Sequence, residues 1–529
     1  MKKNEISKPR LRWAELFLAL LTGTALIFGC QSAVNYEGGN PNGHPRSLFM
    51  KESEVVEDEA EFNTEEYSKI TENTFHEALQ NPLSTFSIDV DNASYSNIRR
   101  YLTEGQLPPA DAVRIEEMIN YFSYNYPQPT GEHPFSIYNE VAACPWNKDH
   151  LLVHIGLQGK SPDYENLKPS NLVFLIDVSG SMDEPNKLPL VKKSMEILVE
   201  NLSRHDRVAM VVYAGNAGVV LPSTSMEDKE DILEALDDLQ AGGSTAGGEG
   251  LQLAYKIAKQ NLLKDGNNRV ILCTDGDFNV GISSTSELVR FIEEKRKDDI
   301  YLTICGFGMG NYKDGRLEEI SNAGNGNYFY IDNRKEAEKV FAKELRANLF
   351  TIAKDVKIQV EFNPQTVEAY RLIGYENRML AKEDFNDDQK DAGELGAGHT
   401  VTALYEIVPK GKPYSGGKVD KLKYQQTSLS PNANEKDLLT VKLRYKPIKS
   451  ENSNLLSEII TIDEITGKPS ADFRFSAAVA EFGMLLINSE FKGSSSFSQI
   501  EELAKETSGD PEKEEMLELI GKAEKLSDN

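Results

Sequence analysis

The stretch NLVFLIDVSGSM, residues 171–182, decides the fold of the region around it. Residues 172–176 form a short apolar run without polar alternation, which is typical of a strand buried on both faces. The sequence Ser-Gly-Ser at 179–181 favours a turn, so the strand should end near Asp177. One carboxylate and two hydroxyls therefore gather beyond the carboxyl end of a buried strand, where open α/β sheets usually hold their ligands.

Strands and helices alternate on both sides of this stretch, over residues 166–350. Such alternation predicts a doubly wound α/β domain with a mainly parallel sheet. The expected strands cover residues 172–176, 207–213, 218–221, 269–274, 300–305 and 327–331. The expected helices cover residues 187–203, 227–239, 248–262, 285–297 and 334–348.

Two further loops of this domain carry oxygen donors. Thr245 lies in the glycine-rich stretch 242–250 before an expected helix, and Asp275 directly follows the strand RVILCT. Because the carboxyl ends of parallel strands share one edge of a sheet, these loops should converge on Asp177. The predicted metal site has no His or Cys and consists of Asp177, Ser179, Ser181, Thr245 and Asp275.

Two carboxylates and three hydroxyls suit Mg²⁺, which takes octahedral oxygen ligands and keeps waters in the remaining positions. Mn²⁺ or Ca²⁺ could use the same oxygens. Three neutral hydroxyls leave residual positive charge on the metal, so a carboxylate from outside could replace a water. The expected partner is therefore a protein that offers an Asp or Glu side chain.

The sequences DVSGSM, GGST and TDG, in this order, resemble the metal-ion-dependent adhesion site of von Willebrand factor type A domains. The resemblance includes all five liganding positions. It implies that Ser179, Ser181 and Thr245 are direct ligands and that both Asp residues bind directly or through water. The flanking sequences FSIDVDNASYSNIRRYL, VRIEEMINYF and DVKIQVEFNP resemble a group of exported bacterial lipoproteins built around this domain.

Other kinds of site are disfavoured by residue type. The 242–250 loop has no Lys-Ser/Thr after its glycines, and the stretch 306–311 ends in Asn where a dinucleotide-binding fingerprint needs Gly. A hydrolase needs a base beside its nucleophile, and none of the 7 histidines falls in the three loops. The net charge of −26 argues against nucleic acid as a partner. We therefore expect no enzyme.

The amino terminus has the proportions of a secretory signal. Basic residues precede the apolar segment 16–29, which as a helix of about 21 Å is too short for a bilayer core of ~30 Å. The segment ends in Leu-Ile-Phe-Gly-Cys30, which resembles the lipobox of bacterial lipoproteins. The resemblance implies a signal peptide over 1–29, lipid on Cys30 and a protein anchored to a bacterial membrane, facing the periplasm or the cell surface. An uncleaved anchor is the alternative.

The remaining cysteines, Cys144, Cys273 and Cys305, are odd in number and do not suggest a disulfide framework. Residues 30–80 are polar and then acidic, which predicts a disordered tether. Residues 81–165 should form a flanking domain with a helix over 110–122. Within it, Asp89 and Asp91 lack the rest of a calcium loop, so we expect a strand end and a helix cap.

After the α/β domain the pattern changes. Residues 351–450 contain alternating strands and predict a β-rich domain, with loops over 384–398 and 410–436. Its strands could pair with 130–160, so that the α/β domain is inserted between them. Residues 451–529 predict packing helices.

The favoured hypothesis is a membrane-tethered protein that binds a partner through Mg²⁺. The alternative is an envelope scaffold in which the metal is only structural. A third hypothesis, an accessory to a cytoplasmic ATPase, conflicts with export.

Overall fold

The computed structural model describes residues 65–528, except 90, 162–167, 244–246, 277–283, 311, 345–349, 417–422, 425–427, 432 and 506–508. The predicted signal peptide, Cys30 and Thr245 lie outside the described residues. Among the described helices, none has both the length and the apolar character needed to cross a membrane.

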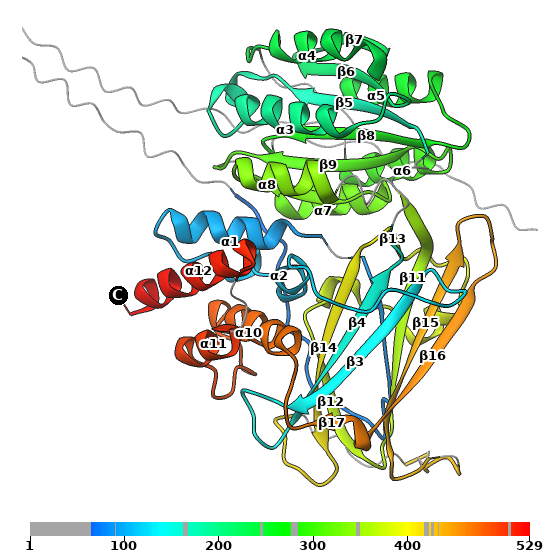
Figure 1. Ribbon diagram of the computed structural model, residues 1–529, viewed down its shortest axis with the longest axis vertical. Coiled ribbons are helices and arrows are strands. Elements are labelled where there is room, and N and C mark those ends of the chain that lie inside the picture. The colour runs from blue at the N-terminus through cyan, green and yellow to red at the C-terminus, as the bar shows by residue number, and fades with distance from the viewer. Residues whose placement is uncertain are drawn as a thin grey trace, which may run out of the picture. The chain divides into compact units, whose positions relative to one another are not determined.

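The α/β domain is built on a six-stranded sheet in the order β10-β9-β8-β5-β6-β7 (Figure 1). Its strands are β5 (Ser170–Asp177), β6 (Arg207–Ala214), β7 (Asn216–Ser225), β8 (Asn267–Thr274), β9 (Tyr301–Phe307) and β10 (Tyr328–Ile331). All pairs are parallel except that of the edge strand β7 with β6. The predicted doubly wound, mainly parallel sheet is therefore confirmed.

Helices cover both faces of this sheet because β5 is apolar on both. Leu172, Phe174 and Ile176 pack into one core, and Val173 and Leu175 into the other. The first face is covered by α3 (Leu188–Asn201), α4 (Lys229–Asp237) and α8 (Arg334–Lys339). The second is covered by α5 (Gly247–Gln260), α6 (Thr285–Arg296) and α7 (Asp314–Ala323). The last expected helix changes to a π-helical turn, η4 (Val340–Glu344), and α7 was not predicted.

The flanking segments form two more sheets that share one apolar core. The six-stranded sheet contains β1 (His76–Glu77), β12 (Val367–Ile373), β14 (Thr400–Pro409), β4 (Leu151–Gly159), β3 (Phe135–Ala143) and β17 (Ile465–Thr466), in that order. The five-stranded sheet contains β13 (Gly393–Gly396), β11 (Thr351–Phe362), β15 (Asp437–Pro447) and β16 (Asn454–Thr461), and β2 (Leu83–Ser87) also pairs with β11.

Strands from before and after the α/β domain lie side by side in both sheets. β4 pairs antiparallel with β14, and β2 pairs antiparallel with β11. The α/β domain is therefore an insertion in the sequence of a β-domain. One part of the β-domain comes before the inserted residues in the sequence, and the other part comes after them.

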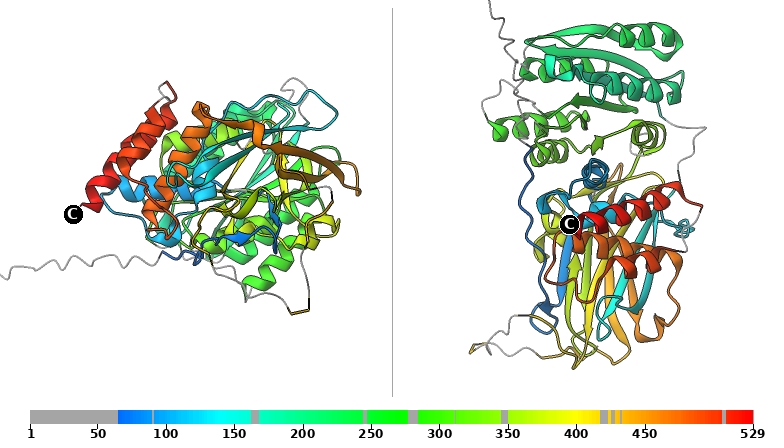
Figure 2. Two further views of the ribbon diagram at one scale, coloured as in Figure 1. Left: turned by 90° about the horizontal axis from the view of Figure 1, so that it is seen from below. Right: turned by 90° about the vertical axis from the view of Figure 1, so that its left-hand side faces the viewer.

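The right-hand view of Figure 2 shows the carboxyl-terminal helices in front of the six-stranded sheet. Five helices share one apolar core with the outer face of this sheet. They are α1 (Ala93–Thr103), α2 (Ile115–Asn120), α10 (Ala471–Leu486), α11 (Phe497–Ala504) and α12 (Pro511–Ser527). Short 3₁₀ turns complete the described chain: η1 (Ala110–Ala112), η2 (Gly180–Asp183), η3 (Met226–Asp228), η5 (Glu376–Arg378), η6 (Lys382–Asn386) and η7 (Ile462–Glu464).

Four predictions for the flanks are wrong in detail. The tether was expected to reach residue 80, but β1 pairs with β12 and Phe75 is buried. The helix expected over 110–122 breaks because Arg114 is extended and donates its backbone N–H to Ser94 Oγ. The carboxyl-terminal region is not all helical, since β16 pairs with β15 before α10 begins. The loop expected over 384–398 contains β13.

Candidate metal centre

The predicted metal ligands lie at the carboxyl edge of the parallel sheet. Asp177 is the last residue of β5, and Asp275 follows the neighbouring strand β8. Ser179 and Ser181 lie in the turn after β5, at η2. Gly242 donates to Val178 O at 2.8 Å and Gly180 donates to Gly243 O at 3.1 Å, so the start of the glycine-rich loop lies against this turn.

Hydrogen bonds hold the turn so that its oxygens lie close together. The Ser179 backbone N–H donates to Asp177 Oδ1 at 2.9 Å, and the hydroxyls of Ser179 and Ser181 are 3.0 Å apart. Asp177 and Ser179 are buried, with 0% and 2% of their surface exposed, whereas Ser181 is exposed. The site therefore has a buried carboxylate floor and an accessible hydroxyl rim.

The carboxylates carry free acceptor atoms in a buried place. Among the described residues, Asp177 Oδ2 and Asp275 Oδ1 are buried and have no hydrogen-bond partner. Burial, and to a smaller degree the charge of Asp275, raises the pKa of Asp177 to about 6, although hydrogen bonds from Ser179 and Tyr213 oppose the shift. Buried polar atoms are normally satisfied, because leaving them unpaired is costly. A hard cation would satisfy both oxygens, so this donor set fits Mg²⁺.

A lysine that the sequence did not indicate also lies in this site. Lys187 Nζ is 3.4 Å from Asp275 Oδ2, donates to Ser181 O at 3.0 Å and lies 3.3 Å from Glu184 Oε1. Only 5% of Lys187 is exposed. Its stem passes Gly308, where an added Cβ would lie 2.5 Å from Lys187 Cε. The sequence pattern pointed to oxygen ligands of a metal, and a positively charged side chain such as that of Lys187 is not one of them.

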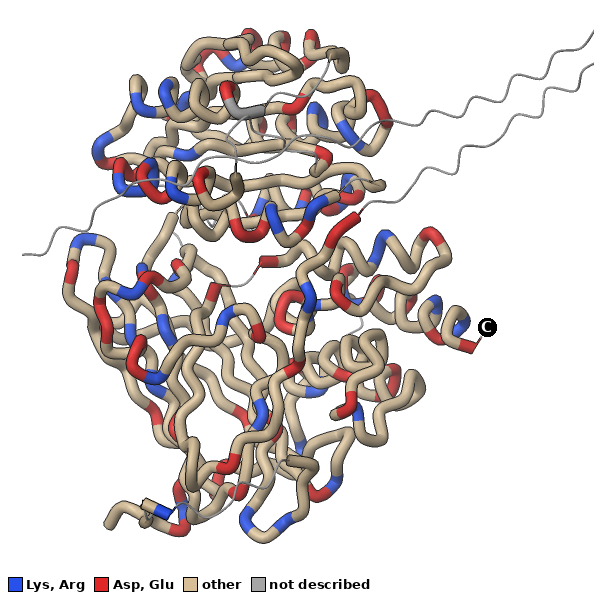
Figure 3. The backbone as a smooth tube through the Cα atoms, turned by 180° about the vertical axis from the view of Figure 1, so that it is seen from behind, with Lys and Arg blue, Asp and Glu red and all other residues tan. Residues whose placement is uncertain are grey.

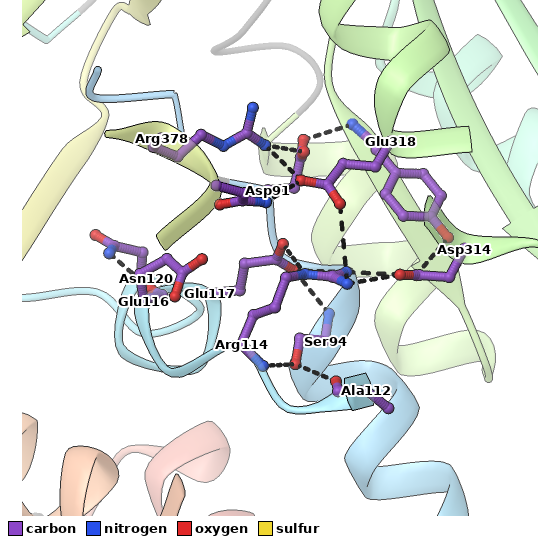
Figure 4. A network of polar contacts seen from close by, with 12 residues as sticks. Asp91, Ser94, Ala112, Arg114, Glu116, Glu117, Asn120, Asp314, Glu318 and Arg378 are labelled. Atoms are coloured by element: carbon purple, nitrogen blue, oxygen red, sulfur yellow. Dashed lines mark hydrogen bonds and ion pairs between the residues drawn. The ribbon is translucent and has the colours of Figure 1, made fainter. Parts of the chain in front are cut away.

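A second charged cluster joins α7 to the flanking helices (Figure 4). Arg114 Nη1 contacts Asp314 Oδ2 at 2.6 Å and also pairs with Glu117. Arg378 Nη2 contacts Asp91 Oδ2 at 2.9 Å. All five side chains are buried. The cluster therefore holds part of the α/β domain to the flanks by ion pairs removed from water.

Three acids of this cluster, Asp91, Glu117 and Glu318, place carboxylate oxygens within 4.8 Å of one another. Burial raises the pKa of all three, while the two arginines act in the opposite direction. Because each acid already pairs with an arginine, the cluster is an ion-pair network. The predicted helix cap is wrong: Asp91 accepts from the backbone N–H of Tyr328 at 2.8 Å, and α1 has no side-chain cap.

Over the rest of the described chain, basic residues are interspersed with acidic ones, as Figure 3 shows. The arrangement differs from the single basic stripe that marks many nucleic-acid interfaces.

Three family models match this chain. The model described as von Willebrand factor type A domain matches residues 171–343. One described as von Willebrand factor matches 61–154, and one described as the C-terminal part of the uncharacterized protein YfbK matches 347–526.

Known proteins match over different shares of the chain. The uncharacterized protein YfbK of Escherichia coli is 41% identical over 476 residues, which cover 88% of this chain and 82% of that protein. The inter-alpha-trypsin inhibitor heavy chain H4 of Bos taurus is 26% identical over 33% of this chain and 20% of its own length. A solved von Willebrand factor type A protein from Catenulispora acidiphila is 18% identical with a TM-score of 0.40, and covers 75% of this chain and 91% of that one. The chain therefore belongs to the YfbK family, and a von Willebrand factor type A domain lies at its centre.

Proposed function

We propose that this protein is a binding module of the bacterial cell envelope whose type A domain holds Mg²⁺ and recognises an acidic residue of a protein partner. The type A domain itself indicates a role in protein–protein interaction. The observation that carries the metal proposal is the pair of buried oxygens, Asp177 Oδ2 and Asp275 Oδ1, that lack hydrogen-bond partners among the described residues.

Five residues would hold the ion: Asp177, Ser179, Ser181, Thr245 and Asp275. The bound ion would supply a positive charge to which a carboxylate of the partner can bind. The carboxylates at the floor provide the charge that attracts the ion. The exposed rim at Ser181 leaves a side from which a partner could approach.

Charge around the rim supports a metal-dependent contact. Asp183 and Glu184 are exposed next to Ser181, and the two buried carboxylates lie beneath it. The single positive charge of Lys187 offsets only part of the negative charge of these four carboxylates. Without a further cation the site would therefore repel an acidic partner, since like charges at close range cost free energy. Binding of such a partner should depend on the metal.

The tether is a separate part of the proposal and rests on the amino-terminal sequence. Lipid on Cys30 would anchor the protein to a bacterial membrane, facing the periplasm or the cell surface. Mass spectrometry of the membrane fraction tests it: the proposal requires a diacylglyceryl modification on Cys30 that the Cys30→Ala variant lacks. An unmodified, uncleaved terminus would contradict it.

The metal proposal is tested with Asp177→Ala and a matched control, Asp231→Ala, which removes an exposed carboxylate of α4. Isothermal titration with Mg²⁺ should show binding to the wild type and the control, and at least a tenfold loss for Asp177→Ala. Crosslinking pull-down from envelope extracts should then recover a partner in Mg²⁺ and lose it in EDTA.

The scaffold alternative makes a different prediction. If the metal is only structural, Mg²⁺ raises the melting temperature by mass action, but the partner is recovered equally in EDTA. If the wild type binds none of Mg²⁺, Mn²⁺ and Ca²⁺, both hypotheses are refuted: the metal that binds a partner and the metal that is only structural.

A further inference from the structure

We propose that Lys187 is an internal competitor of the metal: its ammonium group shares Asp275 with the divalent ion and sets how tightly that ion binds. The inference rests on the proposed metal site and deepens it. It assigns a role to a residue that is not a ligand and cannot be one while protonated.

The geometry places the ammonium group beside two of the predicted ligand residues. Lys187 Nζ lies 3.4 Å from one oxygen of Asp275, while the other oxygen has no hydrogen-bond partner among the described residues. The same Nζ donates to the backbone carbonyl of Ser181, whose hydroxyl is a predicted ligand. Lys187 therefore contacts two of the five ligand residues.

The fold holds the lysine in this position. Lys187 is the residue directly before α3, and its backbone N–H donates to Glu184 O. Its stem packs on Gly308 of the turn after β9, and the φ of +71° there is one that glycine adopts without strain. Because the stem is enclosed, the ammonium group cannot swing into solvent as an exposed lysine would.

A fixed positive charge at this place has two effects on a divalent ion. It neutralises part of the charge of Asp275, which weakens the attraction for the ion, and it repels the ion directly. Both effects fall off slowly with distance in a buried site. The wild-type site should therefore bind metal more weakly than its two carboxylates alone would allow, and exchange it more readily.

Three variants of Lys187 separate the effect of its charge from that of its packing. Lys187→Met keeps an unbranched stem against Gly308 and removes the charge, whereas Lys187→Arg keeps the charge. Lys187→Gln is a second neutral variant that can still donate to Ser181 O. Lys193→Met is the matched control, because Lys193 lies in α3, the helix that Lys187 precedes, with 60% of its side chain exposed.

The experiment is isothermal titration of the full chain with Mg²⁺ and with Mn²⁺, with circular dichroism to show that each variant folds. We expect Lys187→Met and Lys187→Gln to bind Mg²⁺ about tenfold more tightly than the wild type. Lys187→Arg and Lys193→Met should stay within about twofold of it.

Equal affinity of wild type and both neutral variants would overturn the inference while leaving the proposed metal site intact. Weaker binding by both would also overturn it, because Lys187 would then only position the Ser181 backbone. If neither wild type nor neutral variants bind any divalent ion, the proposed metal site fails and this inference fails with it.

Discussion

Replacing Arg114 by Ala should strongly destabilise the protein, because this arginine joins the α/β domain to its flanks. Arg114 Nη1 lies 2.6 Å from Asp314 Oδ2, and these side chains are 3% and 0% exposed. The substitution leaves buried carboxylates without their counter-charge. Breaking a buried pair from one side costs about 3–5 kcal/mol.

An exposed ion pair provides the control. Arg334 Nε lies 2.9 Å from Glu338 Oε1, and their side chains are 75% and 52% exposed. Because water screens such a pair, Arg334→Ala should cost at most about 0.5 kcal/mol. Both substitutions replace an arginine by alanine. The difference between their losses of unfolding free energy therefore measures the effect of burying the ion pair.

Urea unfolding followed by circular dichroism measures both variants against the wild type. The midpoint should fall clearly for Arg114→Ala and hardly at all for Arg334→Ala. A broader or two-step transition in Arg114→Ala would show that the domains have begun to unfold separately. Adding Asp314→Leu to Arg114→Met should recover part of the loss, because no unpaired Asp314 then remains. Equal stability of Arg114→Ala and Arg334→Ala would refute the argument that this network holds the domains together.

Two further predictions concern the helices on the outer face of the sheet. Burial raises the pKa of Glu481 to about 8 from a reference of 4.5, so the folded state keeps this proton over a range where the unfolded state has lost it. The contribution of Glu481 to the free energy of unfolding should therefore be largest below pH 4.5. It should decrease as the pH rises to about 8, by at most about 1.4 kcal/mol per pH unit. Glu481→Gln should remove that slope in urea midpoints taken from pH 5 to 9, and a slope unchanged in the variant would contradict the assignment. Phe475→Ala should cost about 3–5 kcal/mol in urea unfolding, since Phe475 is fully buried with its ring 4.8 Å from that of Phe122. A loss below about 1 kcal/mol would show that this core is not packed as described.

The sequence predicted the parallel sheet well because burial on both faces leaves a clear pattern. The strand expected at 172–176 is β5, which extends by only a few residues. In contrast, β12 was not predicted, because Arg371 interrupts its apolar run and is buried beside two acids, Glu406 at 3.1 Å and Glu72 at 3.9 Å. A buried arginine cannot be recognised without its partner.

The same limit applies to other missed features. The short helix α7 has few buried apolar positions, chiefly Leu317 and Ile320, and β16 is a strand mainly through its pairing with β15. At the candidate site, chain order and strand ends were enough to bring Asp177, Ser179 and Asp275 together. The role of Arg114 was not predictable, because its partner Asp314 is 200 residues away in sequence.

The insertion of the α/β domain between paired strands also affects how the protein is made. A chain that emerges from its amino terminus exposes β4 long before β14 exists, and these strands pair from Thr400 with Gln158 onward. At typical rates of synthesis the delay is roughly 10–50 s. The inserted domain has its own cores and can fold during this time. Until β14 is made, the edge of β4 that pairs with it stays unpaired. The newborn chain is therefore most prone to aggregate through its first half, and a chaperone that shields a strand edge would help it most there.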